Sequence, residues 1–221
     1  MNADRTSPPQ SDDNARYWKK RLRKRRGSLR GVGDVKRSDN ENISLYATKR
    51  RIVFSLLNAV GIVDRMDGLR VLDAGCGIGM LSELFYILGA KVTGVDVSKV
   101  ALKEAVHRCP DGDFRVGSLT AFKVENQRFD LIICADVLYH IVDDRNWTEA
   151  MRNLAGHAAP GGVIIVIDQI RAEPERRASH VRFRTRAMYD EVLLALGAHA
   201  VALPGKAGIL AYRLPVDAGA D

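Results

Sequence analysis

A short apolar strand that runs directly into alternating glycines constrains the fold of this chain more than any other feature. The segment Val71-Leu72-Asp73-Ala74-Gly75-Cys76-Gly77-Ile78-Gly79 precedes residues 80–88, which have a pattern typical of a helix. Glycines at every second position let the backbone turn tightly from strand to helix and approach a ligand closely. The segment therefore predicts the first strand, turn and helix of a ligand-binding α/β domain.

The rest of the chain alternates between strand-like and helix-like stretches. Strands are expected at 91–96, 113–116, 129–135 and 163–168, and helices at 44–60, 99–108, 145–157 and 186–196. Two last strands, 198–203 and 208–214, are separated by Pro204-Gly205-Lys206, a turn too short for a parallel crossover. This order predicts an α/β fold with a doubly wound sheet, mostly parallel, that ends in an antiparallel hairpin.

Positive charge is concentrated ahead of this alternating region. The chain has a formal net charge of +7, yet residues 16–37 alone contain eleven Lys or Arg and one Asp. The remainder of the chain is therefore mildly acidic. We divide the chain into a disordered tail (1–15), a basic arm or lid (16–43), a folded domain (44–215) and a C-terminal tail (216–221).

The cysteines and the apolar runs indicate the compartment. Cys76, Cys109 and Cys134 are odd in number and lack metal-ligand spacing, so we expect buried free thiols in a reducing environment. No cluster of His or carboxylates has the spacing of a metal site, so no metal is expected. The first residues lack the apolar segment of a signal peptide, and the longest apolar runs are strand-length. These features predict a cytoplasmic protein without a membrane segment.

The carboxylates near the glycine turn distinguish between two classes of cofactor. A dinucleotide fingerprint needs a third glycine where this chain has Met80. Asp73, just before the turn, disfavours a pyrophosphate but suits a cationic amino-acid group. Asp96 ends the next strand, about 20 residues on, where a carboxylate binds ribose hydroxyls; capping the following helix is its alternative role. The pattern favours S-adenosylmethionine over NAD.

Four segments together resemble the successive motifs of class I S-adenosylmethionine-dependent methyltransferases. They are DAGCGIGMLS, VTGVDVS, FDLIICADVLYHIVD and LAGHAAPGGVIIVIDQI, and the resemblance extends over about residues 45–214. It implies a Rossmann-like, seven-stranded sheet with an antiparallel last strand. It also implies S-adenosylmethionine as the cofactor and S-adenosylhomocysteine as the product.

The resemblance also implies roles for individual residues at the cofactor. Gly75, Cys76, Gly77 and Gly79 would line its methionine and ribose, Asp73 would act near its amino group, and Ala135 would lie beside its methionine moiety. Asp96 would bind the ribose hydroxyls, Val97 would pack on the adenine, and Ser118 and Leu119 would flank the adenine ring. The family usually has an acidic residue at the position of Ser118, so this chain departs from the family there. Trp18, with Tyr17, and Tyr46 are candidates for a lid over the cofactor, with ordinary packing as the alternative for Tyr46.

Candidate catalytic residues follow the strand at 129–135. His140 is the best candidate for a general base, because its intrinsic pKa is near neutral, although packing alone is the alternative. Asp136 is expected to orient the cofactor or the acceptor, and Tyr139 to line the acceptor pocket. Further along, Arg182 and Arg184 alternate with apolar residues, so both could face an acceptor carboxylate or phosphate, with His180 as a second base. A solvated surface loop is the alternative for that segment.

Three classes of function remain open from the sequence. Methylation of an O or N atom of a small, anionic metabolite such as a sugar, an amino acid or a natural-product intermediate is favoured. Methylation of RNA or DNA is second, with the basic arm binding phosphates. It is disfavoured because Cys134-Ala135-Asp136-Val137 stands where base-amino methyltransferases have an Asn/Asp-Pro-Pro-aromatic signature. A module that binds the cofactor without catalysis is third, because the cofactor motif is intact.

Overall fold

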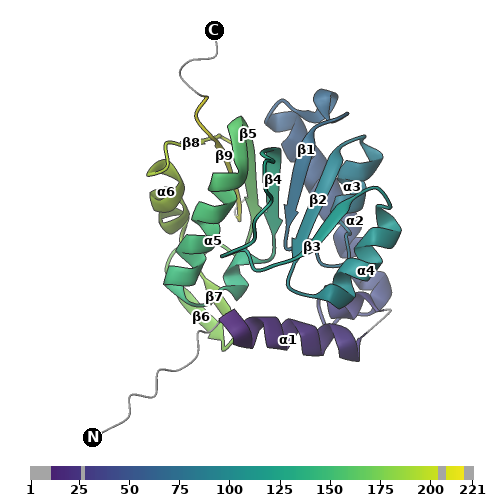
Figure 1. Cartoon of the computed structure of the whole chain (residues 1–221). Coiled ribbons are helices and arrows are strands. Elements are labelled where there is room, and N and C mark those ends of the chain that lie inside the picture. The colour runs from purple at the N-terminus through teal and green to yellow at the C-terminus, as the bar shows by residue number, and fades with distance from the viewer. Residues whose placement is uncertain (1–10, 26–27, 204–207, 217–221) are drawn as a thin grey trace, which may run out of the picture.

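A seven-stranded sheet forms the centre of the structure, a computed structural model that describes residues 11–25, 28–203 and 208–216 (Figure 1). The strand order is β3-β2-β1-β4-β5-β9-β8; the strands from β1 to β5 pair in parallel, and β9 is antiparallel to both of its neighbours. The predicted Rossmann-like sheet is confirmed. The strands are β1 (Arg70–Ala74), β2 (Lys91–Asp96), β3 (Asp113–Val116), β4 (Phe129–Ala135), β5 (Ala158–Ile167), β8 (His199–Ala200) and β9 (Ile209–Arg213).

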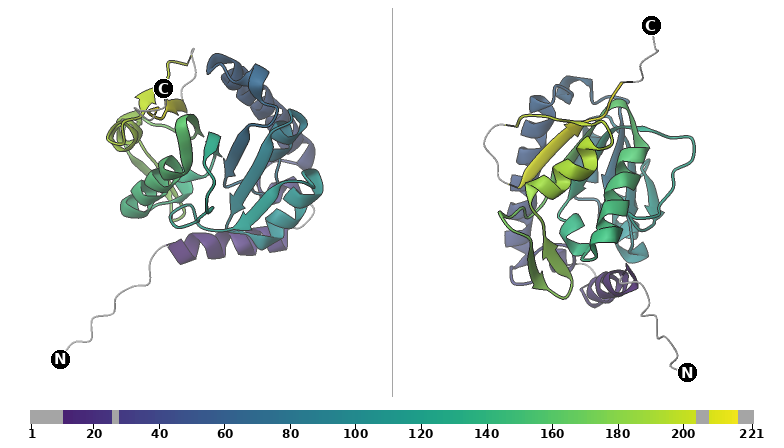
Figure 2. Two further views of the ribbon diagram at one scale, coloured as in Figure 1. Left: turned by 45° about the horizontal axis from the view of Figure 1, so that its top comes forward. Right: turned by 90° about the vertical axis from the view of Figure 1, so that its left-hand side faces the viewer.

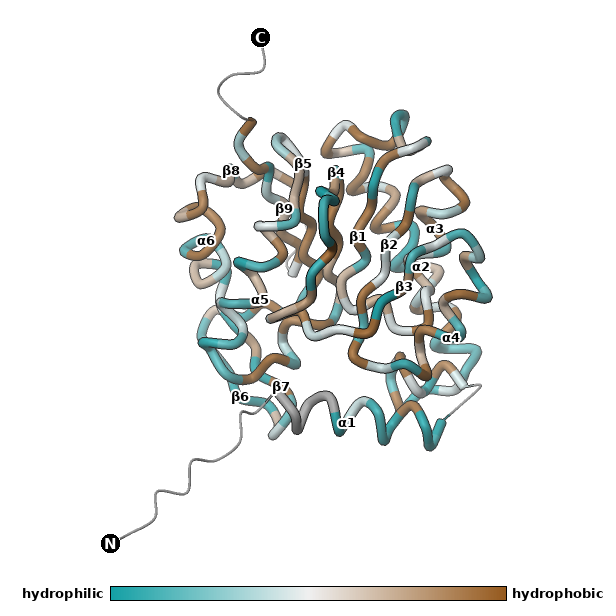
Figure 3. The backbone as a smooth tube through the Cα atoms, viewed as in Figure 1, coloured by the Kyte–Doolittle hydropathy of each residue, from teal (hydrophilic) through white to brown (hydrophobic). Residues whose placement is uncertain are grey.

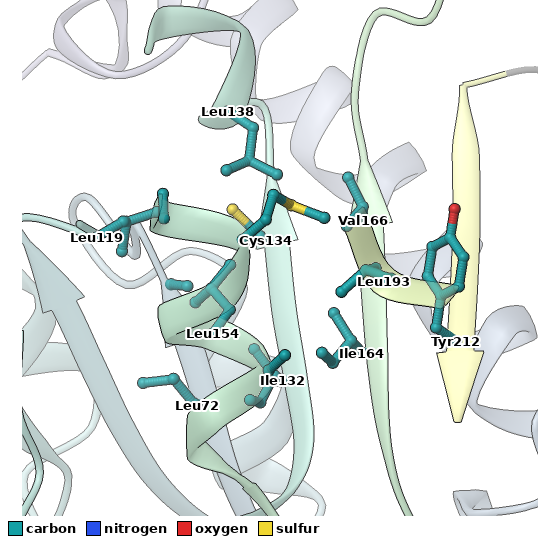
Figure 4. Packing of buried hydrophobic residues seen from close by; sticks show 14 of the residues in the cluster. Leu72, Leu119, Ile132, Cys134, Leu138, Leu154, Ile164, Val166, Leu193 and Tyr212 are labelled. Carbon is teal, nitrogen blue, oxygen red and sulfur yellow. The ribbon is translucent and has the colours of Figure 1, made fainter. Parts of the chain in front are cut away.

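Helices cover both faces of this sheet, because successive residues of a strand point to opposite sides. On one face, Leu72, Ile132 and Ile164 pack with residues of α5 and α6, among them Leu154 and Leu193 (Figure 4). On the other, Val71, Leu131 and Ile165 pack with residues of α2 and α3. The helices are α2 (Asp39–Ala59), α3 (Ser82–Ile87), α4 (Lys99–Arg108), α5 (Asp144–His157) and α6 (Arg186–Leu194).

Helix α2 begins five residues earlier than its apolar pattern predicted. Ser38 accepts a hydrogen bond from Glu41 N at 3.3 Å, and the Glu41 carboxylate accepts one from Ser38 N at 2.7 Å. This capping box satisfies two backbone N–H groups that a helix start leaves without partners. The Ser-x-x-Glu spacing was a visible signal, but residues 39–42 are all polar, so apolar periodicity does not extend to the start of the helix.

The basic arm folds into helix α1 (Ser11–Lys24) and a short 3₁₀ turn, η1 (Leu29–Gly31). Figures 1 and 2 show α1 crossing the edge of the sheet where the parallel strands end, and Figure 3 shows hydrophilic residues along much of it. The helix includes residues 11–15, which we had assigned to the tail, so the boundary at residue 15 was wrong. The remaining tail residues, 1–10 and 217–221, and the expected turn at 204–206 lie outside the described residues.

The connection between β5 and α6 contains a hairpin that the sequence pattern did not predict. Strands β6 (Glu175–Ala178) and β7 (Val181–Phe183) pair antiparallel in a separate two-stranded sheet. Strand β5 also begins at Ala158, before the Pro-Gly-Gly sequence that was expected to precede it, and its register with β4 shifts there. Within the described part of the chain, no helix is both long and apolar enough to cross a lipid bilayer.

Gly79 gives a direct test of the packing between the glycine turn and α4. Its φ is +78°, and a Cβ there would lie 2.9 Å from Ala105 Cα. Gly79→Ala is expected to lower the free energy of unfolding by about 2–4 kcal/mol, from backbone strain and overpacking together. Chemical denaturation measures the change.

The matched control is Gly156→Ala in α5, where an added Cβ meets no atom within 4 Å. That change should be neutral or stabilise the fold by under about 1 kcal/mol. Similar effects of both substitutions would contradict the packing role of Gly79.

Candidate active site

The site begins where parallel strands end at one edge of the sheet. The strand order reverses between β1 and β4, and ligands of open α/β sheets bind at such a switch point. The glycine turn follows β1, Asp96 ends β2, Asp136 follows β4, and Asp168 follows β5. Asp136 N donates to Ile167 O at 2.8 Å, which ties the ends of β4 and β5 together.

The glycine turn is held by its own backbone and by its neighbours. The N–H groups of Gly75 and Cys76 donate to Val95 O at 2.7 and 3.1 Å. Gly75 has a φ of +81°, and a Cβ there would overlap the Val137 side chain. At Gly77, also at positive φ, a Cβ would meet only Val32, at 3.3 Å. Gly77 is therefore the glycine of this turn whose backbone is least covered by the protein, as a cofactor cradle requires.

Asp96 is fixed beside that cradle. Its carboxylate accepts hydrogen bonds from Gly77 N at 3.0 Å and from Ser98 N at 2.8 Å. Ser98, whose hydroxyl accepts from Ala101 N, is the N-cap of α4, so the alternative that Asp96 caps this helix is excluded. Burial raises the pKa of Asp96, and the two backbone N–H groups act in the opposite direction. Each carboxylate oxygen keeps a second lone pair, which a ribose hydroxyl could use.

Asp73 and the cysteines lie deeper in the protein. Asp73 is buried, and Ser82 Oγ donates to it at 2.6 Å. Burial raises the pKa of Asp73 to about 6, against the effect of that hydrogen bond. Cys76, Cys109 and Cys134 are buried free thiols, as expected, and burial raises the pKa of each.

The loop after β3 is held by a contact between its own hydroxyls and by its packing on the core. The hydroxyls of Ser118 and Thr120 lie 2.8 Å apart. The Leu119 side chain is buried in the hydrophobic core, and its carbonyl accepts from Asn153 Nδ2 at 3.0 Å. Val97 is half-buried beside Asp96 in the chain. The adenine contacts expected of Val97, Ser118 and Leu119 stay predictions.

Asp136 has a partner that sequence reasoning missed. Lys49 of α2 forms an ion pair with the Asp136 carboxylate, and its ammonium lies 5.2 Å from the centre of the Tyr46 ring. Asp136 also has a φ of +58°, a conformation that a non-glycine residue adopts at some energetic cost. No local pattern indicates Lys49, because its partner lies 87 residues away. Tyr46 is half-buried, and burial, then Asp136 and Asp73, raise its pKa.

His140 is held in one orientation. It ends the 3₁₀ turn η3 (Leu138–His140), and its Nδ1 lies 2.9 Å from His180 O. A carbonyl only accepts, so Nδ1 carries the proton and Nε2 keeps its lone pair. Nε2 has no hydrogen-bond partner among the described residues. Burial lowers the pKa of His140 to about 4, so the ring is neutral at neutral pH.

Aromatic side chains of α1 cover this histidine. Trp18 packs edge-on against His140 with ring centres 4.9 Å apart, and Tyr17 stacks on His180 at 4.3 Å. Tyr139 lies against His140 from its own turn, at 4.3 Å. The structure thus brings together four candidate site residues from separate parts of the sequence: Trp18, Tyr139, His140 and His180.

The two arginines expected to bind an acceptor anion are used within the protein instead. Arg182 and Arg184 both bind Asp144, at 2.7 and 2.9 Å. The Arg184 side chain is fully buried, donates to Ile141 O at 2.8 Å and lies over the Trp147 ring. They do point the same way, as the alternation predicted, but toward the start of α5. The assignment of Arg184 to acceptor binding was therefore wrong, and Arg182 already has a carboxylate partner.

Asp168 is a further buried carboxylate at this edge of the sheet, and no role was predicted for it from the sequence. It follows β5, accepts from Tyr189 O–H at 2.5 Å and from Gln169 N at 2.8 Å, and burial raises its pKa to about 7. Its position at a strand end, like that of Asp96, was the available signal. In the part of the chain that is described, no three His, Cys, Asp or Glu side chains are grouped as metal ligands.

Comparison with known proteins identifies a domain within the chain. Residues 71–162 match a family described as methyltransferase domain, and this stretch contains the glycine turn, Asp96, Asp136 and His140. Residues 71–162 therefore form a methyltransferase domain, of the class I, S-adenosylmethionine-dependent kind. The methyl donor of this class is S-adenosylmethionine, and similar structures have been solved with it and with S-adenosylhomocysteine bound.

Curated relatives of this methyltransferase domain include two ubiquinone biosynthesis O-methyltransferases. The one from Leptothrix cholodnii is 34% identical over 110 residues, 47% of this chain and 46% of the relative. The one from Bordetella bronchiseptica is 36% identical over 102 residues, 44% and 41% of the two chains. The match thus spans less than half the length of these relatives.

Solved structures extend the likeness of the fold to the arm. Magnesium protoporphyrin IX methyltransferase from Synechocystis, with bound S-adenosylmethionine, has a TM-score of 0.71 at 21% identity over 97% of this chain and all of that one. CalS10, an amino pentose methyltransferase from Micromonospora echinaspora, has a TM-score of 0.60 at 20% identity over 76% and 91% of the chains. At these identities the likeness establishes the fold.

The buried Asp168–Tyr189 pair predicts a pH dependence of stability. The pKa of Asp168 is raised to about 7 in the folded state. Between about pH 4 and 7 the Asp168 carboxyl therefore stays protonated in the folded protein but is ionised in the unfolded chain. Stability is therefore lost as the pH rises from about 4 to 7. Asp168→Asn should raise the Tm at pH 8 by about 2–4 °C more than at pH 5, measured by differential scanning calorimetry.

Asp111→Asn is the control, because Asp111 accepts a hydrogen bond from Tyr86 O–H at 2.9 Å on the exposed surface. It should shift the Tm equally at both pH values. A pH-independent effect of Asp168→Asn would show that burial does not raise the pKa of this carboxyl.

Proposed function

We propose that this chain transfers the methyl group of S-adenosylmethionine to an oxygen or nitrogen atom of a small organic acceptor. The observation that carries the proposal is the fixed orientation of His140 in the loop after β4, on the same sheet edge as the glycine turn and Asp96. The names of the curated relatives favour oxygen as the methylated atom. Their short overlap leaves the acceptor itself to experiment.

The residues at the strand ends fit the cofactor. The Gly77 backbone would approach it, and Asp96 would hold its ribose hydroxyls with lone pairs not used by Gly77 and Ser98. The bound cofactor supplies an electrophilic methyl group on a positively charged sulfur. The protein then has to orient the acceptor in line with that methyl group and exclude water.

His140 Nε2 is the group that would take the proton from the acceptor. With the Nδ1 proton bound to His180 O, the ring cannot rotate freely, and Nε2 presents a lone pair. Trp18 and Tyr17 cover the two histidines and would keep water from the acceptor. Lys49 holds Asp136 and thereby fixes the start of the loop that leads to His140.

Nucleic-acid methylation is less consistent with the site. The basic residues of α1 lie on one helix, of which Arg16, Lys19, Lys20, Arg23 and Lys24 are exposed. The aromatic residues of that helix, Tyr17 and Trp18, pack on histidines of the site and are not presented for base stacking. A small acceptor enclosed under α1 agrees better with this arrangement.

Calorimetric titration with S-adenosylhomocysteine tests the cofactor site. The parent protein should bind it with micromolar affinity, and Asp96→Asn should weaken binding about 10–100-fold, because a hydrogen bond to a charged group contributes about 1.5–3 kcal/mol. Asp113→Asn, on the neighbouring strand and half-exposed, is the control and should bind like the parent. Absence of binding to the parent would rule out the proposed function.

A second prediction concerns the base. With a panel of phenols, hydroxy acids and amino sugars as acceptors, His140→Gln should reduce kcat/KM about 10²–10⁴-fold for any acceptor that is turned over. The affinity for S-adenosylhomocysteine should stay unchanged, and His107→Gln on exposed α4 should have no effect. Because a base must be unprotonated and burial lowers the pKa of His140 to about 4, kcat/KM should fall only below about pH 5. An acidic limb near pH 6.5 that persists in His140→Gln would assign the proton transfer to another group.

A further inference from the structure

Arg21 of α1 is a cation in the site region without a carboxylate partner among the described residues. Its Nη2 donates to two backbone carbonyls, Arg30 O at 3.1 Å and Gly33 O. Its Nε is buried and has no hydrogen-bond partner. A buried N–H without an acceptor costs about 1–3 kcal/mol, so such a group is expected to meet an acceptor when a ligand is bound.

The surroundings of Arg21 place it on the side of the proposed base. Its guanidinium lies 4.8 Å from the centre of the Trp18 ring, and Trp18 packs against His140. Burial is the largest cause of the pKa shifts of Tyr139, His140 and His180, and the positive charge of Arg21 also acts on the pKa of each. By contrast, burial and two backbone hydrogen bonds account for the pKa shift of Asp96 without Arg21.

The other cations near the site already have carboxylate partners. Lys49 is paired with Asp136, and Arg182 and Arg184 share Asp144. Arg21 is instead fixed by neutral carbonyls, which hold the guanidinium in place but leave its charge uncompensated. Its geometry is thus set before a ligand arrives, which lowers the entropic cost of recognition.

We propose that Arg21 binds an anionic oxygen, a carboxylate or a phosphate, on the methyl acceptor. A guanidinium has five N–H donors in a planar fork, and the Nε of Arg21 remains for such an oxygen. The aromatic ring of Tyr139, which lies against His140, favours an acceptor with an aromatic or otherwise flat body. The inference rests on the proposed function, since it assigns the substrate class of the same site.

A pair of probes that differ in charge tests this assignment. Protein saturated with S-adenosylhomocysteine is titrated with benzoate and with its neutral counterpart benzamide, and the tryptophan fluorescence, to which Trp18 and Trp147 both contribute, is followed. The parent should bind benzoate at least about tenfold more tightly than benzamide, as charge-assisted hydrogen bonds imply. In Arg21→Gln the two affinities should agree within about twofold.

Two further variants distinguish a direct contact of Arg21 with the anion from a long-range effect of positive charge and from displacement of α1. Arg23→Gln removes the same charge from an exposed position of the same helix and should keep the parent's preference for benzoate. Arg21→Lys keeps the charge and one donor toward the carbonyls, and should retain part of the preference. Equal loss in Arg23→Gln, or no preference for benzoate in the parent, would overturn the proposal.

The cofactor also has a carboxylate, which Arg21 could bind in place of the acceptor's. The affinity of Arg21→Gln for S-adenosylhomocysteine distinguishes these two alternatives. Arg21→Gln should bind S-adenosylhomocysteine within about twofold of the parent. A loss there as large as the loss for benzoate would assign Arg21 to the cofactor's carboxylate and overturn the acceptor assignment. Failure of the parent to bind S-adenosylhomocysteine would instead contradict the proposed function as a whole.

Discussion

The close approach of the glycine turn to the β4 loop is the constraint on which the rest of the site depends. Gly75 leaves no room for a Cβ beside Val137, so the backbone after β1 packs directly against the Val137 side chain of the loop after β4. That contact brings Gly77, the proposed cofactor cradle, and the turn with His140 to the ends of two adjacent strands. A side chain at Gly75 would separate the methyl donor's site from the proposed base, whatever its effect on the fold.

Charge is distributed around this contact in a way that residue types alone do not reveal. Asp144 binds two arginines, and Lys49 compensates Asp136, so most cations near the site stabilise the protein's own loops. Arg21 differs because its partners are carbonyls. The sequence led us to expect an anion-binding group in the β7 segment, and we propose Arg21 of α1 for that role instead.

The sequence predicted the fold well because the sheet depends on local patterns. Apolar runs such as 129–135, glycines at positive φ, and Asp96 at a strand end are all properties of neighbouring residues. The pairings of Lys49 with Asp136 and of Arg184 with Asp144 span 87 and 40 residues, and no local pattern encodes them. The hairpin of β6 and β7 was missed for a related reason: its charged strands show no buried face, since three of the four β6 residues are Glu or Arg.

The hairpin, the arm and the base form one connected unit. His180, in the turn between β6 and β7, supplies the carbonyl that orients His140, and its ring stacks on Tyr17 of α1. Trp18, one residue on, packs on His140 itself and under the guanidinium of Arg21. Because these contacts share side chains, displacement of α1 would remove the cover of His140, the stacking partner of His180 and the proposed anion-binding group together. Docking of α1 would therefore also assemble the proposed acceptor site. The inward residues of this helix, Trp18, Arg21 and Leu22, make the contacts, while its other cations face solvent. A helix so rich in like charges can thus contribute to a specific site.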